Sequence, residues 1–419
     1  MAERIDAGRW SDGFLDAKRQ HADPPGDDLI HKIFASAGIA EAERRIETIS
    51  RLFDTLVAAE SPRGSELPGD ILHFWTSDPL PRWADRERIK RGQQLFESYG
   101  PLIVIILFCS SLPRAYLAAK GVQVLNLTAF LSQDPRRRVI ETAQMLVDAL
   151  TPGGLQQPGA FGISSARKVR VMHAAIRFLI QNRGTWNTAK LGIPINQEDL
   201  GGTLCTFSVG VIQGLERIGV TLSETEAEDY LHTWKVIGHI LGLDEDMLPR
   251  DVRDATALAE RIAARHFAVS FEGRYMMNAL TELMKELTPY RIFDGLPSST
   301  VRFLIGDEHA DLLGVPPADW TRHLIRGLRA GARVFDRWSD GSPAHQRLGQ
   351  VFGGALLRGL LEMERGPKRV TFRIPVELGR QIGREPARRP GGRVWRFLRG
   401  AWRGIRRRVR AWWGPARGG

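Results

Sequence analysis

His173 is the residue of this sequence whose type and surroundings best suit it for chemistry. It shares one face of a predicted helix with Val169 and Ile176, because the three residues recur at spacings of three and four. Arg170 and Arg177 flank it about one turn away on either side. A buried imidazole in an apolar surround with cations nearby is what haem iron needs as a proximal ligand. The same pattern also fits a histidine that only fills the core, so this segment alone leaves both interpretations open.

A second predicted helix carries three polar residues that could act together. Arg138, Glu141 and Thr142 lie at i, i+3 and i+4 and therefore share one face. The opposite face is apolar between residues 139 and 150. Such a polar face is often simply solvated. Alternatively, a guanidinium, a carboxylate and a hydroxyl point together into a site that this face lines.

The two segments together resemble the rubber oxygenase (latex clearing protein) family, which also includes the endoplasmic-reticulum-bound oxygenase of fungal mycophenolic acid synthesis. The resemblance rests on Arg138-x-x-Glu141-Thr142 followed by Val169-Arg-x-x-His173-Ala-x-x-Arg177. Further matching segments are Leu80–Asp85, Ser111–Tyr116, Gly192–Asp199, Trp234–Gly242 and Ala310–Pro316. It runs from about residue 66 to 320, and more faintly to Leu378. The order and spacing of these segments carry it, because no single one is specific.

The resemblance implies a haem enzyme that uses dioxygen. His173 is similar to the proximal ligand of a b-type haem, so the resemblance predicts that it is the iron ligand. Arg170 and Arg177 beside it are expected to help bind the cofactor. Arg138 and Thr142 resemble the distal-side arginine and threonine of the rubber-cleaving members, where they would polarise bound oxygen. The implied reaction is attack of dioxygen on an alkene of a hydrophobic, isoprenoid- or lipid-like substrate.

This sequence departs from the family pattern at two positions. The rubber-cleaving members have a lysine, which can close onto the iron, where this chain has Glu141. They also use a distal glutamate, for which the nearest candidate here is Gln123, and an amide cannot act as that base. A lysine-gated closed state and a polyisoprene substrate are therefore in doubt. Glu141 can take over proton handling only if the pocket shields it and shifts its pKa.

The composition is that of a globular protein with an ordinary core. Of the 419 residues, 43% are hydrophobic and 26% are charged, enough for one large core or two modest ones. Both cysteines, Cys109 and Cys205, lie in apolar runs, so we expect a reducing cytoplasm and no disulfide framework. The first residues lack the basic and apolar regions of a signal peptide. The apolar run 101–109 is too short to span a bilayer and is expected in the core.

Apolar spacing predicts helices almost throughout, so the expected class is all-α: a large single-domain helical bundle with a globin-like haem-binding core. The predicted helices cover 86–97, 137–150, 166–182, 203–218, 224–241, 254–267 and 273–287. Stops are expected at 98–101 and 151–154, where Gly and Pro occur. The segments 196–199 and 223–226 have the composition of helix N-termini. The connection 151–165 is either a lid or an ordinary loop.

A metal site elsewhere in the chain is less well supported. His232 and His239 lie seven residues apart with Asp229 nearby, but no third ligand completes a set by spacing. We expect one of these histidines in the core and one at the surface. The remaining histidines, including His266, stand alone in the sequence.

The last 36 residues differ from the rest. Residues 384–419 contain twelve arginines and one acid, which equals the +11 net charge of the whole chain. Between 393 and 413, Trp, Leu, Ile and Val recur at spacings of three and four, with arginines one position behind them. This pattern predicts a basic amphipathic helix on an anionic membrane surface. A nucleic-acid-binding arm or a partner-binding helix remains the alternative, although a full face of Trp and aliphatic residues makes nucleic acid unlikely.

The sequence thus predicts three parts: an N-terminal helical extension (1–65), a helical oxygenase-like domain (66–380) and a basic tail (381–419). The predicted protein is a bacterial haem b-dependent oxygenase in the cytoplasm, peripheral to the inner face of the membrane. Two alternatives remain open. One is a non-catalytic haem binder or sensor, and the other is a membrane-associated helical scaffold in which His173 is a core residue.

Overall fold

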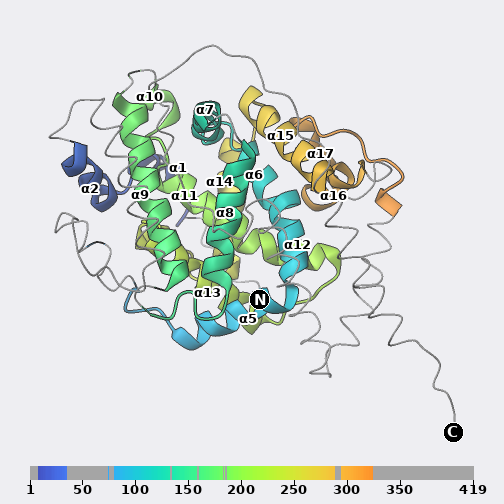
Figure 1. Ribbon diagram of the computed structural model, residues 1–419, viewed down its shortest axis with the longest axis horizontal. Coiled ribbons are helices and arrows are strands. Elements are labelled where there is room, and N and C mark those ends of the chain that lie inside the picture. Colours follow the sequence, from blue (N-terminus) through green and yellow to red (C-terminus); the bar gives the residue numbers. More distant parts are fainter. Residues whose placement is uncertain are drawn as a thin grey trace, which may run out of the picture.

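The computed structural model of this chain describes residues 8–34, 74, 80–132, 135–157, 160–182, 184, 186–287 and 294–323; for the helical residues between 128 and 141 it describes the backbone alone. Across these ranges the chain folds into helices (Figure 1), and they contain no strand, only one isolated antiparallel bridge between Ala118 and Phe267. The predicted all-α class is therefore confirmed. The predicted domain boundaries at 65/66 and 380/381 lie outside the described residues, and so does the basic tail.

Most successive helices within the described ranges are joined by short connections. The first half of the described chain forms α1 (Asp12–Arg19), α2 (Pro24–Phe34), α5 (Arg86–Ile106), the π-helical turn η1 (Leu107–Ser111), α6 (Leu112–Leu117), α7 (Val122–Ser132), α8 (Pro135–Leu150) and α9 (Phe161–Asn182). The second half forms α10 (Thr188–Leu191), α11 (Gln197–Phe207), α12 (Val209–Ile218), α13 (Glu224–Ile240), the 3₁₀ turn η2 (Glu245–Met247), α14 (Val252–His266), α15 (Phe271–Leu287), α16 (Leu296–Ile305) and α17 (Asp307–Leu312).

The predicted helices coincide with observed ones, with one internal break. The region predicted as a single helix over 203–218 is divided at Ser208, whose backbone angles (φ −100°, ψ −88°) are not helical. The Ser208 hydroxyl donates to the carbonyl of Leu204 at 2.7 Å. Such back-bonding by serine competes with the regular helix and bends it. The break separates α11 from α12, which both contribute to the site below.

The stop predicted at 98–101 is wrong. Helix α5 continues through Pro101 to Ile106, then through η1 into α6, so residues 86–117 form one continuous helical rod. Proline removes one helical hydrogen bond and normally kinks or ends a helix. Here the side chains that follow it, such as Ile103 and Ile106, are fully buried. Burial of these side chains stabilises the helix by more than the missing hydrogen bond costs.

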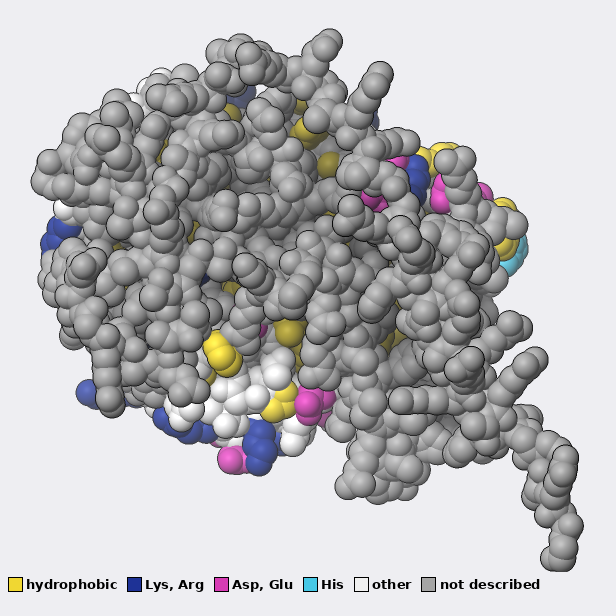
Figure 2. Space-filling model, viewed as in Figure 1, with side chains coloured by type: hydrophobic (Ala, Val, Ile, Leu, Met, Phe, Trp, Pro, Cys, Tyr) yellow, Lys and Arg dark blue, Asp and Glu magenta, His cyan; other side chains and the backbone are white. Residues whose placement is uncertain are grey.

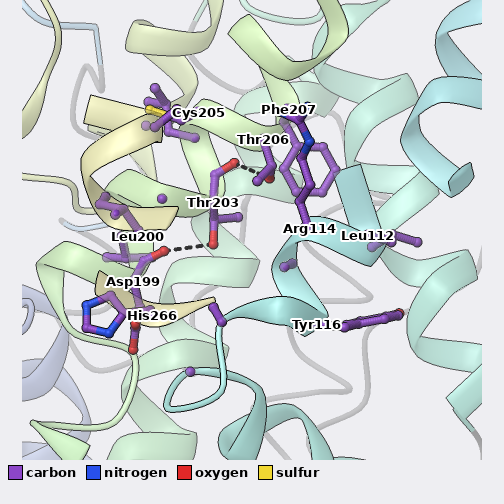
Figure 3. Close-up of a pocket in the computed structure, with 18 of the residues that line it drawn as sticks. Leu112, Arg114, Tyr116, Asp199, Leu200, Thr203, Cys205, Thr206, Phe207 and His266 are labelled. Atoms are coloured by element: carbon purple, nitrogen blue, oxygen red, sulfur yellow. Dashed lines mark hydrogen bonds between the residues drawn. The ribbon is translucent and has the colours of Figure 1, made fainter. Parts of the chain in front are cut away.

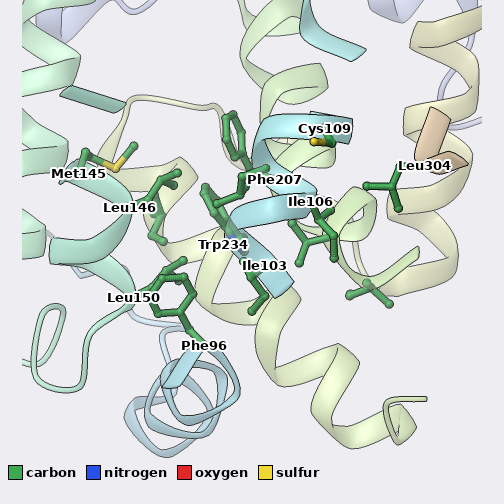
Figure 4. Close-up of a cluster of buried hydrophobic side chains, with 14 of the residues drawn as sticks. Phe96, Ile103, Ile106, Cys109, Met145, Leu146, Leu150, Phe207, Trp234 and Leu304 are labelled. Carbon is green, nitrogen blue, oxygen red and sulfur yellow. The ribbon is translucent and has the colours of Figure 1, made fainter. Parts of the chain in front are cut away.

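This rod forms the centre of the hydrophobic core (Figure 4). It packs against α13 along most of its length and also against α8, α12 and α16. The side chains that meet there include Phe96, Ile103, Ile106, Cys109, Met145, Leu146, Leu150, Phe207, Trp234 and Leu304. The Phe207 and Trp234 rings stack with their centroids 5.4 Å apart. Both cysteines are buried free thiols, as the sequence predicts.

Within the described residues, the same rod has the length and composition to cross a membrane: 32 residues with a mean hydropathy of 1.8 in its apolar window. Half of that window is buried inside the protein. A core helix passes the same test, and the partners of this one are protein helices. From the sequence, the apolar run 101–109 is considered alone, because a helix is expected to stop at Pro101. The observed helix is much longer than this run. Its location in the hydrophobic core agrees with the expectation.

Two N-terminal helices pack directly on the helices that form the site. Helix α1 lies against α11, and α2 lies against α9. Arg9 and Trp10 both donate to the carboxylate of Asp254, at the start of α14. In Figure 1, α8 and α9 run side by side on the near face, with α2 on one flank and α15 to α17 on the other. The described N-terminal residues are thus part of the packed helical fold.

The predicted helix starts are also observed. Ser223 and Glu226 form a reciprocal capping box at the N-terminus of α13. The side chain of Asn196 accepts a hydrogen bond from the backbone N–H of Asp199 and caps α11. The connection after α8 turns tightly at Gly154, whose carbonyl accepts from the N–H of Ile163 at 3.2 Å. Since α9 begins at Phe161, this segment is an ordinary short connection rather than a long lid.

The described surface carries charges of both signs. In the part visible in Figure 2, Lys and Arg side chains lie next to Asp and Glu side chains along the lower and right-hand edges. This mixture agrees with the sequence, in which residues 1–383 are neutral overall.

Candidate functional site

A cavity of about 600 Å³ lies between the two long helices α8 and α9 and the α6–α11–α12 side of the bundle. Its volume is within the range of ligand and cofactor pockets. Thr142 of α8 and His173 of α9 both line it. The structure therefore brings together two residues that the sequence assigned to one site, from helices 31 residues apart in the chain.

The surroundings of His173 are apolar. Side chains from α7, α8, α9 and the loop before α11 line the cavity near it: Val124, Leu125, Met145, Val169, Met172, Ile176 and Ile195. The imidazole itself is partly exposed to the cavity, and its Nδ1 atom is buried. An imidazole in such a surround has the donor chemistry of a haem ligand, and the apolar walls suit a porphyrin.

Arg138 and Glu141 lie on α8, one turn and one residue before Thr142. The structure describes the backbone alone at these two positions. Their predicted catalytic roles therefore stay predictions. Gln123, on α7, donates to the carbonyl of Ala119 at 3.4 Å and is not among the residues that line the cavity.

Arg170 and Arg177 are engaged with the N-terminal helices. Arg170 forms a two-point ion pair with Asp23, with both N···O distances 2.7 Å. Arg177 is fully buried and donates to Asp27 at 2.7 Å and to the carbonyl of Ile195 at 3.0 Å. Neither arginine is among the residues that line the cavity. Their ion pairs tie α9, which carries the histidine, to α2; their role in binding a cofactor stays a prediction.

Ile195 lies at the cavity wall in a strained backbone conformation. Its φ of 53° is in the left-handed region, where β-branched residues are rare. The bond from Arg177 holds its carbonyl, and its side chain packs against Ile176 and Ile180 of α9. Such a strained backbone conformation persists where many surrounding contacts hold it in place, and strained residues are concentrated at functional sites.

A buried ionic cluster supports another wall of the cavity, the one that includes His266. Glu198 is fully buried and accepts from Arg265 at 2.8 Å and from Arg19 at 3.0 Å, and it lies 2.8 Å from Nε2 of His266. His266 ends α14 and lines the cavity. Burial raises the pKa of Glu198, but His266, Arg265 and Arg19 outweigh it and lower that pKa to about 2. The cluster joins α1, α11 and α14.

Asp199 is the carboxylate of this cluster that faces the cavity. It lines the cavity beside Leu200 and Thr203 (Figure 3) and lies 3.0 Å from Arg19. Burial raises the pKa of Asp199 above its ordinary value, although Arg19 opposes the shift. A carboxyl whose pKa rises toward neutrality can exchange a proton more readily under physiological conditions.

Glu198 leads to a prediction about stability. Replacing Glu198 by Gln is expected to cost about 3 kcal/mol of unfolding free energy at pH 7, because the pKa in the folded state (about 2) lies below the ordinary 4.5. This contribution is fully present above pH 4.5 and is lost as the pH falls through the folded-state pKa. Urea unfolding of both proteins between pH 7 and pH 2.5 measures it. Exposed Glu308→Gln is the control; a difference that does not shrink at acid pH contradicts the assignment.

In the structure, His232 and His239 both lie on α13. No cluster of His, Cys, Asp or Glu suited to a metal ion occurs among the residues that the structure describes. His232 is buried and accepts from the backbone N–H of Asp85 at 2.9 Å, and His239 is half-buried. The Trp83 ring contacts both imidazoles edge-on. Burial and the nearby cations Arg88 and Lys235 lower the pKa of His232 to about 4, so it is neutral at pH 7.

Sequence reasoning missed the cavity roles of Asp199 and His266. Asp199 was interpreted only as part of a helix start, which it is, and His266 has no partner at a telling spacing. Their proximity depends on α11 packing against α14, a contact that no local pattern reveals. The segment 192–199, part of the family resemblance, was the one signal that pointed to this wall.

Comparison with known proteins agrees with this picture. A family model described as "ER-bound oxygenase mpaB/B'/Rubber oxygenase, catalytic domain" matches residues 104–337, more than half of the chain. The chain is 27% identical over 276 residues to the rubber oxygenase of Streptomyces sp. (strain K30), covering 62% of this chain and 64% of that protein. It thus spans less than two thirds of that relative.

The fold is also similar to that of a solved structure. The latex clearing protein LCP in the closed state matches with a TM-score of 0.67 and 22% identity, over 85% of this chain and 95% of that one. At this identity the match supports the helical fold alone. The family model, which covers the cavity helices from α6 to α16, decides the relationship. This chain belongs to the family of ER-bound oxygenase mpaB/B' and rubber oxygenase catalytic domains.

Proposed function

We propose that this protein is a haem b-dependent oxygenase that cleaves an alkene of a hydrophobic substrate. The observation that carries the proposal is the meeting of His173 and Thr142 in one apolar cavity, in a chain of the rubber oxygenase family. His173 would hold the iron. The rubber oxygenase relative and the family model support oxygen chemistry on a polyisoprene-like chain.

The residues present fit a haem group. Imidazole is a usual axial ligand of haem iron, and methionine and branched side chains make up much of the wall around His173. When bound, haem would supply the activation of dioxygen. The protein would contribute the position of the ligand, a dry pocket and hydrogen-bond donors. The ion pairs of Arg170 and Arg177 would keep α9, and so the imidazole, in a fixed orientation.

The chain's own polar groups have separate tasks in this proposal. The Thr142 hydroxyl would donate a hydrogen bond within the cavity, and by resemblance Arg138 would add positive charge from the same helix. Asp199 lines the cavity, and burial raises the pKa of its carboxyl above the ordinary value. As a carboxylate, it would offer the proton-accepting group that the amide of Gln123 cannot provide. The apolar walls would exclude water and accept the hydrocarbon chain.

Oxygen uptake tests the proposal. Haem-loaded full-length protein is expected to consume dioxygen and form carbonyl products with squalene, which has alkenes, and not with squalane, the saturated equivalent. Mass spectrometry of the products identifies the cleaved bond. If haem-loaded protein shows no uptake with squalene or with short polyisoprene, the oxygenase proposal fails. That result would favour the non-catalytic haem binder, in line with Glu141 in place of the family's lysine.

We propose further that residues 393–413 hold the protein on an anionic membrane surface, as a cytoplasmic protein at its inner face. Support comes from the sequence alone: the arginines and the Trp and aliphatic face of this segment. If the apolar substrate resides in the membrane, attachment through this tail would bring the protein close to it.

Deleting residues 384–419 is expected to release the protein from membranes and leave the haem site intact. Each arginine near an anionic surface contributes about 1 kcal/mol, so binding should weaken with salt. A salt-resistant part is expected to disappear when Trp395, Trp402 and Trp412 become Ala. Flotation with vesicles of anionic and of zwitterionic lipid measures both effects. Binding to RNA or DNA with a steep salt slope, and not to vesicles, would show a nucleic-acid arm instead.

A further inference from the structure

Two arginines line the cavity at the side opposite the α8–α9 pair. Arg114 comes from α6 and Arg217 from the last turn of α12. Gln213, one turn earlier on α12, accepts a hydrogen bond from Arg114 at 3.3 Å and also lines the cavity. Arg217 donates to the carbonyl of Leu304 on α16. Two guanidinium groups, an amide and the exposed carboxylate of Glu216 therefore form one polar corner of an otherwise largely apolar cavity.

This pair of cations is not neutralised by the protein. Among the residues that the structure describes, no carboxylate lies within the 4.0 Å range of an ion pair with either guanidinium. By contrast, Arg19, Arg170 and Arg177 each have a carboxylate partner. Burial and the charge of Arg217 both lower the pKa of Arg114. Burial makes the charge of Arg114 costly unless an anion joins it, whereas the exposed Arg217 stays hydrated and can contact the same anion.

The fold holds Arg114 firmly in this position. The π turn η1 precedes α6 directly, and the N–H of Leu112 bonds to the carbonyl of Leu107, five residues back. Leu112 and Arg114 of α6, directly after this turn, both line the cavity. The Ser111 hydroxyl donates to the carbonyl of Thr206 at 2.6 Å and fixes α6 against α11. Single π turns of this kind are frequent at functional sites.

The cavity thus has two chemically different ends. Thr142 and His173 lie at the end formed by α8 and α9, whereas α12 packs mainly against α5, α11 and η1. Apolar side chains from α6 and α11, such as Leu112 and Phe207, line the same cavity as Arg114 (Figure 3). Arg217 is exposed, so its end of the cavity opens toward solvent. This arrangement suits an elongated molecule with a water-soluble anionic head and an apolar chain.

We propose that Arg114 and Arg217 bind the oxyanion head, carboxylate or phosphate, of an amphiphilic substrate whose unsaturated chain extends toward His173. This inference rests on the proposed oxygenase function and specifies its substrate class. Guanidinium groups bind such heads through two parallel hydrogen bonds, and the Gln213 amide N–H₂ group can add another. The substrate would then be an unsaturated fatty acid, or an isoprenoid acid or phosphate, rather than a neutral hydrocarbon.

Binding of ligands with one common chain tests the proposal. The probes are oleate, oleyl phosphate and the neutral oleyl alcohol, with inorganic phosphate alone as a fourth ligand. Affinity is measured by calorimetry on the haem-loaded full-length protein, and haem content is recorded from its absorption. We expect oleate or oleyl phosphate to bind at least about tenfold more tightly than oleyl alcohol, since each charged hydrogen bond contributes at least that factor. The tighter binder of oleate and oleyl phosphate shows whether the site prefers a carboxylate or a phosphate head group.

Four variants and a control separate the possible causes. Arg114→Gln and Arg217→Gln are each expected to reduce the preference for the anion, and both together to remove it. Arg114→Lys is expected to keep part of it, because the charge remains. Exposed Arg253→Gln on α14, which does not line the cavity, is the control for surface charge. Far-ultraviolet circular dichroism verifies that each variant is folded. If Arg114→Gln does not fold, the Arg217→Gln variant tests the proposal, because Arg217 is exposed and its replacement should not disturb the fold.

The proposal is overturned by any of three results. One is equal affinity for oleate, oleyl phosphate and oleyl alcohol. Another is inorganic phosphate binding as tightly as the lipids, which would indicate a simple anion site. The third is a loss of haem in Arg114→Gln with the anion preference kept, which would indicate a haem propionate at this corner. The binding measurements do not require turnover. A preference for the anion without oxygen uptake would therefore refute the oxygenase proposal alone. Cleavage of squalene without a preference for the anion would refute the proposed substrate class alone.

Discussion

Replacing His173 by Ala is expected to abolish stable haem binding. His173 is the histidine on α9 that lines the cavity, and the family resemblance gives it the role of iron ligand. Without an axial nitrogen, the haem would keep only apolar contacts with the walls. The purified variant should therefore lose its Soret absorption or contain haem well below one per chain. Absorption spectra and a pyridine haemochrome assay measure this.

Two further variants make the result specific. His239→Ala removes a half-buried histidine that does not line the cavity, and its haem content should stay at the wild-type level. His173→Gly with added imidazole should regain a haem spectrum, because the free base can occupy the vacated ligand position. A His173→Ala protein with the wild-type spectrum would show that another residue ligates the iron.

Turnover should fall about a hundredfold or more in Arg138→Ala and in Thr142→Ala, with haem content near normal. Both residues are assigned to stabilising charge in the reaction rather than to binding iron, and loss of one positioned donor typically costs that factor in rate. Thr142→Ser keeps the hydroxyl and should retain most of the activity. Oxygen uptake with squalene, compared with haem content in the same sample, measures the effect.

A different result for the Arg138→Ala or Thr142→Ala variant would change the role assigned to that residue of α8. Loss of haem in either Ala variant would give that residue a binding role instead. Glu141 also makes a spectroscopic prediction, since a carboxylate replaces the lysine of the rubber-cleaving members. The resting ferric protein should not show a low-spin His/Lys spectrum, and such a spectrum would rule out that inference.

Much of the fold could be predicted from the sequence, because its helices follow apolar spacing and clear capping residues. Thr142 on α8 and His173 on α9 both line the cavity, whereas the structure describes the backbone alone at Arg138 and Glu141 of the same predicted face. Pro101 misled the prediction, because its cost is local whereas the burial of Ile103 and Ile106 depends on the whole core. At Ser208 the error is the opposite one. The apolar pattern continues without a break, but the hydrogen bond from the Ser208 hydroxyl to the Leu204 carbonyl interrupts the helix.

The charged parts of the site were harder to predict. Arg170 and Arg177 flank the histidine in sequence, yet their carboxylate partners come from residues about 150 positions earlier. The cluster around Glu198 likewise joins α1, α11 and α14. Local periodicity contains no information on which distant charges will pair, since pairing is set by helix packing. For the same reason the unpaired Arg114 and Arg217 could be recognised only in the folded protein.

The central claim is that this chain holds a reactive haem through His173. The most direct measurement is the absorption spectrum of the purified full-length protein in its ferric, ferrous and carbonyl forms. The account predicts about one haem b per chain, reducible iron, and a carbonyl complex typical of histidine ligation, because the opposite side of the iron should be open to a diatomic gas. A protein that purifies without haem and fails to take up added hemin would contradict it.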